Sequence, residues 1–232
     1  MSNAVPNSLS LAVDIPFKGA SKNDTFVLVL GQTGSGKSTF INKAIGEEVA
    51  TVGHDIDPET TTIRYFVATH PNHSDRRFIF VDTPGFDDPF IEDSEILDRI
   101  IKWLKKSCPS RIRLIIVYLL EITQYRNDHM RAGMTPMRLC ITGIAENSVL
   151  ATTKWNLVNQ EVGQKREMAL SMTYGRLAIQ RFTDTRESAW NIANYIPEVN
   201  VVKVSHFRRK LSTALQQRPQ AGFLSAMFSF LF

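Results

Sequence analysis

Short apolar runs alternate along the chain with longer segments in which apolar residues recur at helical spacing. Such short runs, bounded by turn residues, predict buried strands; they are 25–30 (TFVLVL), 76–82 (RRFIFVD), 113–120 (RLIIVYLL), 148–154 (SVLATTK) and 176–182 (RLAIQRF). Segment 62–68 (TIRYFVA) alternates instead, with Ile63, Tyr65 and Val67 on one face, which indicates a strand nearer the sheet edge.

Helices are predicted between these strands and after the last of them. Their segments are 37–46, ending at Gly46, 94–106, 160–172, 185–196, ended by Pro197, and 205–218. In 94–106 we expect Ser94 as the N-cap, with Lys105 and Lys106 in the last turn. Strands that alternate with helices predict an α/β fold, a mostly parallel sheet with helices on both faces. Ligands of such sheets bind beyond the carboxyl ends of the strands.

Composition is that of an ordinary soluble protein, with 232 residues, 43% hydrophobic and 22% charged. We expect a loose N-terminal leader over 1–24, one domain over 25–200, and a basic helix with an apolar tail over 201–232. Cys108 and Cys140 have no metal-ligand or disulfide spacing, and the N-terminus lacks a secretory pattern. These features favour a cytoplasmic location.

The net charge of +4 is concentrated in the C-terminal third, where residues 151–232 carry 11 Lys and Arg against 5 Asp and Glu. No dense basic run with interleaved aromatic residues occurs, so we expect no nucleic-acid partner. Segment 222–232 is apolar apart from two serines, but a helix needs roughly twenty residues to span a bilayer. Either it is an interfacial anchor, with Arg208, Arg209 and Lys210 near anionic headgroups, or it packs on its own domain or a dimer partner.

The strongest chemical signal follows the first strand. "GQTGSGKST" fits G-x-x-x-x-G-K-[ST] between a predicted strand and a helix. Glycines there let backbone N–H groups surround a phosphate, the lysine reaches the β- and γ-phosphates, and the hydroxyl after it binds Mg²⁺. The candidate nucleotide ligands are Gly31, Gln32, Thr33, Gly34, Ser35, Gly36, Lys37, Ser38 and Thr39. The alternative is an ordinary glycine-rich turn.

Two later segments supply further candidates at the phosphate end. "DTPG" places Asp82 at the end of a strand, where it can hold Mg²⁺, and Gly85 where its N–H can meet a γ-phosphate. In "DPETTTI", one threonine can bind Mg²⁺ and sense the γ-phosphate, or the threonines simply begin a strand.

With those motifs in place, "TTKWN" stands where a base-reading motif belongs, and Thr153, Lys154 and Asn156 become candidate base contacts. The sequence here resembles the septin-like P-loop GTPases, which include the immune-associated (IMAP-type) GTPases, the chloroplast import receptors and single-domain fungal G domain-containing proteins. The matching stretches are GQTGSGKSTFIN, VGHDIDPETTTI, FVDTPGFDD, EILDRIIKWL, TTKWN, EVGQKRE and RFTDTRESAW, over roughly residues 25–196.

The resemblance implies a three-layer, Ras-like P-loop fold that binds GTP or GDP with Mg²⁺ and forms dimers across the nucleotide face. It makes Thr60 the switch threonine and a metal ligand beside Ser38 and Asp82, and it gives Lys37 and Thr60 catalytic roles. Some members of these families act at membranes.

The sequence departs from that pattern at three positions. Asn156 replaces an aspartate that accepts two hydrogen bonds from guanine; an amide offers one acceptor and one donor, so guanine preference weakens and xanthine fits better. Phe86 follows Gly85 where Ras-type enzymes carry a water-orienting glutamine. Glu121 aligns with an arginine that acts across the dimer in some relatives, and Arg126 is the nearest substitute.

The sequence therefore predicts a guanine-nucleotide-binding switch with hydrolysis that is slow or needs a dimer or partner. Two alternatives stay open: a scaffold that binds nucleotide without turnover, and a P-loop NTPase of relaxed base choice that takes ATP or XTP.

Overall fold

One mixed sheet organises the protein in the computed structural model, which describes residues 14–50, 62–88, 91–124, 147–174, 177–195 and 201–216. Its strands are β1 Thr25–Gly31, β2 Arg64–His70, β3 His73–Asp82, β4 Arg111–Glu121, β5 Ser148–Thr153, β6 Ala178–Arg181 and β7 Val201–Lys203. They lie in the order β2-β3-β1-β4-β5-β6, and β7 pairs with the beginning of β4. All neighbours are parallel except β2 with β3 and β7 with β4.

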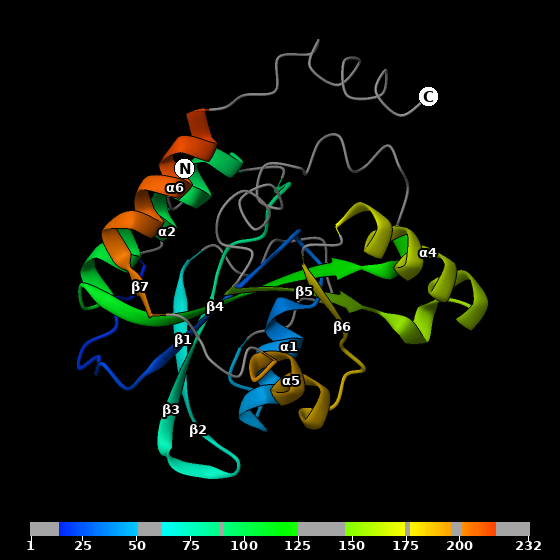
Figure 1. Cartoon of the computed structure of the whole chain (residues 1–232), viewed down its shortest axis with the longest axis horizontal. Helices are drawn as coiled ribbons and strands as arrows, with labels where there is room; N and C mark the ends of the chain where they lie inside the picture. The colour runs from blue at the N-terminus through cyan, green and yellow to red at the C-terminus, as the bar shows by residue number, and fades with distance from the viewer. Residues whose placement is uncertain are drawn as a thin grey trace, which may run out of the picture.

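Helices cover both faces of this sheet (Figure 1). They are α1 Lys37–Ile45, α2 Asp93–Ser107, α4 Gln160–Thr173, α5 Arg186–Ala193 and α6 Val204–Gln216, with short 3₁₀ turns η1 Ile122–Gln124 and η3 Trp155–Leu157. The core on one face includes Phe40 of α1 and Trp190 of α5. The core on the other includes Leu97 of α2, Leu170 of α4 and Phe207 of α6. The three-layer α/β architecture predicted from the sequence is confirmed.

The predicted strands and helices are present, with a few differences at their ends. Glu92 rather than Ser94 is the N-cap of α2, because the helix begins one residue before the serine, at Asp93. β2 is an edge strand as expected, but Val67 is 44% exposed and does not share the burial of Ile63. Helix α5 ends at Ala193, ahead of Pro197, which lies outside the described residues. Strand β7, three residues long, was too short to be predicted from the sequence pattern.

The described part of the expected leader packs on the domain. The backbone N–H of Ile15 donates to the Ile63 carbonyl at 3.1 Å, and the Trp103 indole donates to the Ile15 carbonyl at 2.6 Å. Phe17 is buried beside Phe26 and Tyr65. Residues 14–17 thus lie between β2 and α2. The domain boundaries at residues 24 and 200 stay predictions.

Helix α6 also packs on the domain. Its apolar residues Val204, Phe207 and Leu211 are buried in the core that contains α2, while Arg209 is exposed. The basic, amphipathic helix predicted for this region is therefore present, and its apolar side lies against protein. Within the described ranges, no helix is long and apolar enough to cross a bilayer. The tail at 222–232 lies outside them.

Candidate functional site

The loop between β1 and α1 has the backbone conformation of a phosphate cradle. Gly34 and Gly36 have φ values of 77° and 96°, in the left-handed region that favours glycine. Gly36 is also the N-cap of α1, so no side chain occupies the positive end of the helix dipole. The predicted residues Gly31 to Gly36 thus form a turn after β1, and Lys37, Ser38 and Thr39 begin α1, so the N-terminus of α1 lies at the carboxyl end of β1.

Lys37 lies folded under this loop. Its Nζ donates to the carbonyl of Gln32 at 3.0 Å and to that of Gly31 at 3.3 Å, and the residue is only 7% exposed. Burial lowers the Lys37 pKa to about 8, although the nearby Asp82 and Asp88 carboxylates oppose that shift. A bound phosphate would stabilise this buried cation, since a nearby negative charge favours the protonated lysine.

Ser38 and Asp82 lie together at the start of α1 and the end of β3. The Ser38 hydroxyl is 3.5 Å from Asp82 Oδ2, and the carboxylate is almost fully buried. Burial raises the Asp82 pKa to about 6, partly offset by Lys37 and Arg64. Asp82 Oδ1 is buried without a hydrogen-bond partner among the described residues. Two adjacent oxygen ligands, one of them an unpartnered carboxylate oxygen, suit Mg²⁺. Thr60, the third expected ligand, lies outside the described residues.

The D-x-x-G segment packs directly on the phosphate loop. A Cβ on Gly85 would lie 2.6 Å from the Thr33 nitrogen, so only glycine fits there. The neighbouring Phe86 pairs with the loop through its backbone: its N–H donates to the Gly31 carbonyl at 3.1 Å, and its carbonyl accepts from the Thr33 N–H at 3.0 Å. The Phe86 ring is completely buried in the core. The position after Gly85 therefore anchors the segment and presents no polar side chain to a water molecule.

Two acidic residues continue the D-x-x-G segment over the phosphate loop. Neither belongs to a predicted site. Asp87 Oδ2 is 3.4 Å from the Gln32 amide nitrogen, and Asp88 Oδ2 is 3.5 Å from the Thr33 hydroxyl. The "DD" after "DTPGF" was the only signal in the sequence.

The candidate base loop is joined to the phosphate loop. The Thr153 hydroxyl, at the end of β5, donates to the Ser35 carbonyl at 2.9 Å. Lys154 follows with φ 60°, an unusual conformation for a residue other than glycine, and its Nζ is 2.8 Å from Glu121 Oε2. The structure thus brings the two predicted motifs together at one edge of the sheet.

Trp155 holds the next turn of this loop in place. Its indole N–H lies 3.0 Å from the Thr152 hydroxyl, and the Arg181 guanidinium lies 4.2 Å from the centre of its ring. A Cβ on Gly163 of α4 would lie 2.7 Å from the ring, so helix and ring are in close contact. Asn156, in the same 3₁₀ turn, is exposed and open to a ligand.

Glu121, which aligns with an arginine of some relatives, is a residue of the base region in this structure. Its side chain is only 13% exposed and pairs with Lys154 within the same chain, rather than standing free for a contact across a dimer. The signal that could have located it is its place at the carboxyl end of the strand next to β5. Arg126, the expected substitute, lies outside the described residues.

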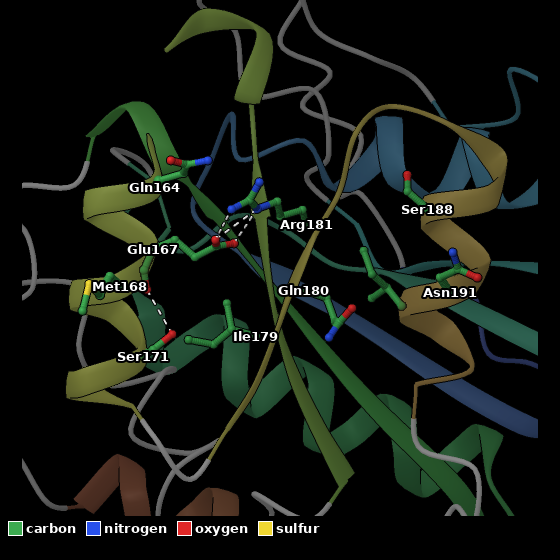
Figure 2. Close-up of a pocket in the computed structure, with 10 residues that line it drawn as sticks. Gln164, Glu167, Met168, Ser171, Ile179, Gln180, Arg181, Ser188 and Asn191 are labelled. Atoms are coloured by element: carbon green, nitrogen blue, oxygen red, sulfur yellow. Dashed lines mark hydrogen bonds and ion pairs between the residues drawn. The ribbon is translucent and has the colours of Figure 1, made fainter. Parts of the chain in front are cut away.

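A separate pocket of about 550 Å³ lies along β6 between α4 and α5 (Figure 2). Its lining includes none of the predicted site residues. It touches the candidate site through Arg181, which pairs with Glu167 on one side and lies over Trp155 on the other.

Comparisons with known proteins agree with this geometry. Residues 26–143 match the sequence model of the family described as 50S ribosome-binding GTPase. GTPase Era of Ehrlichia ruminantium (strain Gardel) is 27% identical over 136 residues, which cover 58% of this chain and 41% of Era. Cell division control protein 10 of Saccharomyces cerevisiae is 35% identical over 94 residues, which cover 38% of this chain and 29% of that protein. The chain therefore spans about two fifths or less of the length of these relatives.

Among solved structures, Toc33 from Arabidopsis thaliana in complex with Mg²⁺ and GMPPNP has the same fold. The TM-score is 0.53 at 20% sequence identity, with 84% of this chain and 86% of that chain covered. With the family match over residues 26–143, the phosphate cradle and the mostly parallel sheet, the chain belongs to the 50S ribosome-binding GTPase family and has its Ras-like P-loop fold.

Proposed function

We propose that this protein is a guanine-nucleotide-binding switch of the septin-like kind, which hydrolyses GTP slowly or with the help of a dimer partner. One observation carries the proposal. The phosphate loop and the Thr153–Asn156 loop meet at one edge of the sheet, joined by the 2.9 Å bond between the Thr153 hydroxyl and the Ser35 carbonyl. A triphosphate lying in the first loop places its base against the second.

Each part of the site has a role in this proposal. The backbone of residues 31–39 and the Lys37 ammonium hold the phosphates, and Gly85 offers its N–H to the γ-phosphate. Ser38 and Asp82, with Thr60, hold Mg²⁺, which neutralises negative charge on the phosphates. Lys154 lies along the base, and Asn156 contacts its edge. The support is the buried Lys37 cation and the unpartnered Asp82 oxygen.

The expected slow hydrolysis follows from what surrounds the γ-phosphate end. Phe86 is buried and cannot orient a water molecule. At the base loop, Glu121 is paired with Lys154 and stands where the resemblance expects an arginine that acts across a dimer. A second subunit could supply the missing group. Dimerization is important for the GTPase activity of the chloroplast translocon components atToc33 and psToc159, whose fold this chain shares. Two alternatives are a nucleotide-bound scaffold without turnover and an NTPase of relaxed base choice.

Nucleotide binding tests the proposal and the role of Asn156 together. We expect the wild-type protein with Mg²⁺ to bind GTP and XTP more tightly than ATP in calorimetry. Asn156→Asp restores the second acceptor for guanine, so GTP should bind more tightly by about 1–3 kcal/mol. Equal affinity for ATP and GTP would support the relaxed NTPase instead, and an unchanged GTP affinity in Asn156→Asp would remove that residue from the site.

Turnover measured against protein concentration separates switch from scaffold. If a second copy assists, the rate per molecule rises with concentration, whereas unaided hydrolysis gives a constant rate per molecule. Absence of any turnover at high concentration would favour the scaffold.

The location proposed is the cytoplasm, with peripheral membrane contact through residues 222–232. The support is the apolar composition of that segment and the exposed Arg209 on α6. Flotation with anionic vesicles should be lost when residues 222–232 are removed, and equal flotation without them would rule out this contact.

A further inference from the structure

Glu121 is held at the base loop by its place in the sheet. It is the last residue of β4 and lies directly opposite Thr153 of β5 in the parallel register. Lys154 is therefore one residue past the paired position, within reach of the carboxylate. Glu121 Oε2 accepts from Lys154 Nζ at 2.8 Å, and Oε1 accepts from the Thr123 hydroxyl.

The turn that carries Thr123 is itself fixed by α4. Arg166 donates from Nη1 to the carbonyls of Ile122 and Thr123, at 2.9 and 2.7 Å. Both oxygens of Glu121 are thus engaged by groups that are themselves held in place. The carboxylate is 13% exposed and the lysine 32% exposed, so water screens this ion pair less than it screens a surface pair.

This pair has a consequence for a bound base. A free lysine side chain loses up to about 2 kcal/mol of rotamer entropy when it is ordered. Because Glu121 already orders Lys154 in the folded protein, that cost falls on folding and not on binding. Asn156 is exposed and uncharged, so no ion pair orders its side chain before a base binds.

We propose that Glu121 is a positioning residue of the nucleotide site, which holds the aliphatic part of Lys154 where a purine ring lies. The proposal rests on the proposed function, because it takes Lys154 to lie against a base. Contact with the ring face does not depend on the groups at the base edge. Glu121 therefore affects guanine, xanthine and adenine nucleotides equally, whereas Asn156 changes the ratio between them.

Glu121→Gln in the full chain tests this, because glutamine keeps the shape and removes the charge. Dissociation constants for GDP, XDP and ADP with Mg²⁺ should each rise about tenfold. This size lies between the small effect of losing an exposed ion pair and the large effect of breaking a buried one. Their ratios should stay unchanged. The matched control is Glu161→Gln on α4, whose pair with Lys165 is 75% exposed on both sides and should leave all three constants unchanged.

A double-mutant cycle separates positioning from a general effect on stability. Lys154→Gln alone should weaken binding, and adding Glu121→Gln should weaken it no further, because the carboxylate acts through the lysine. If Glu121→Gln does not fold, Thr123→Val leaves the ion pair and removes its support, and it should give a smaller loss of the same kind.

The outcomes are distinct. Additive losses in the cycle, or unchanged constants in Glu121→Gln, would overturn the positioning role while the proposed function stands. A change in the base ratios would show that Glu121 contacts the base edge, which also overturns it. If the wild-type protein binds none of the three nucleotides, the proposed function fails and the inference fails with it.

Discussion

At the scale of single residues, Lys37 and Asp82 are charged groups of the site whose burial makes the folded state less stable. Both are buried ionisable groups, and burial shifts the two pKa values toward each other, to about 8 for Lys37 and about 6 for Asp82. Both groups are charged between these values, at neutral pH, where their burial is least favourable. A bound magnesium nucleotide removes this cost, because it brings opposite charge to each group.

The Lys37 shift predicts a pH dependence of stability in the nucleotide-free protein. Its folded pKa of about 8 lies below the usual value of 10.5, so between these pH values the unfolded state binds more protons. The free energy of unfolding should therefore rise as the pH rises from 8 to 10, by roughly 1–3 kcal/mol for this group. Urea unfolding of wild-type protein and Lys37→Met at pH 7, 8 and 10 measures it.

As the pH rises, the free energy of unfolding of the wild type should increase relative to that of Lys37→Met. Lys43→Met, on the same helix, controls for the change of a lysine to methionine. A difference between wild type and Lys37→Met that stays constant from pH 7 to 10 would contradict the prediction.

At the scale of elements, α4 contacts both the base loop and the turn that follows Glu121. Arg166 fixes the turn next to Glu121, Gly163 contacts the Trp155 ring, and Glu167 pairs with the Arg181 that lies over this ring. Figure 2 shows Glu167 and Arg181 pointing toward one another from α4 and β6. The position of α4 therefore sets the geometry of Lys154 and Asn156.

Gly163→Ala tests this arrangement. Alanine is a better helix former by about 1 kcal/mol, yet its Cβ would lie 2.7 Å from the Trp155 ring and displace it. We expect the variant to lose about 1–3 kcal/mol of stability through overpacking and to bind nucleotide more weakly. Thermal unfolding and nucleotide titration measure the two effects, with Ser171→Ala, exposed on the same helix, as the control. A more stable variant with unchanged affinity would show that the ring can move without consequence.

At the scale of the whole molecule, the N-terminal segment connects two elements that are distant in the sequence, β2 and α2. Asp14 accepts from the Ile63 N–H at 2.8 Å, just before β2, and it pairs with Arg99 of α2. In the sequence, β2 follows the threonines at 60–62, and α2 follows the D-x-x-G segment. Asp14 thus joins the residue before β2 to helix α2.

Asp14→Ala should therefore cost more than loss of an ordinary surface charge. It removes two kinds of bond from partly buried groups, and we expect the free energy of unfolding to fall by about 1–3 kcal/mol in urea. Asp98→Ala is the matched control, because Asp98 pairs with Lys102 on the same helix while 48% and 68% of the two side chains are exposed. Its expected cost is much smaller, because water screens an exposed ion pair. Equal effects of the two changes would mean that the segment contributes little to the fold.

The α/β order of elements and the three motifs at the carboxyl edge of the sheet could be predicted from the amino-acid sequence alone. This was possible because strand and helix periodicity, the glycine spacing of the phosphate loop and the positions of Asp82 and Thr153 are local properties of the chain. The aspartate-to-asparagine departure at Asn156 and the apolar Phe86 were also visible there, with their chemical consequences.

The surroundings of those motifs became visible only in the folded protein. The pairing of Glu121 with Lys154, the closure of residues 87–88 over the phosphate loop, and the packing of residues 14–17 between β2 and α2 all join distant parts of the chain. Such contacts depend on strand order, register and burial, which no local pattern contains.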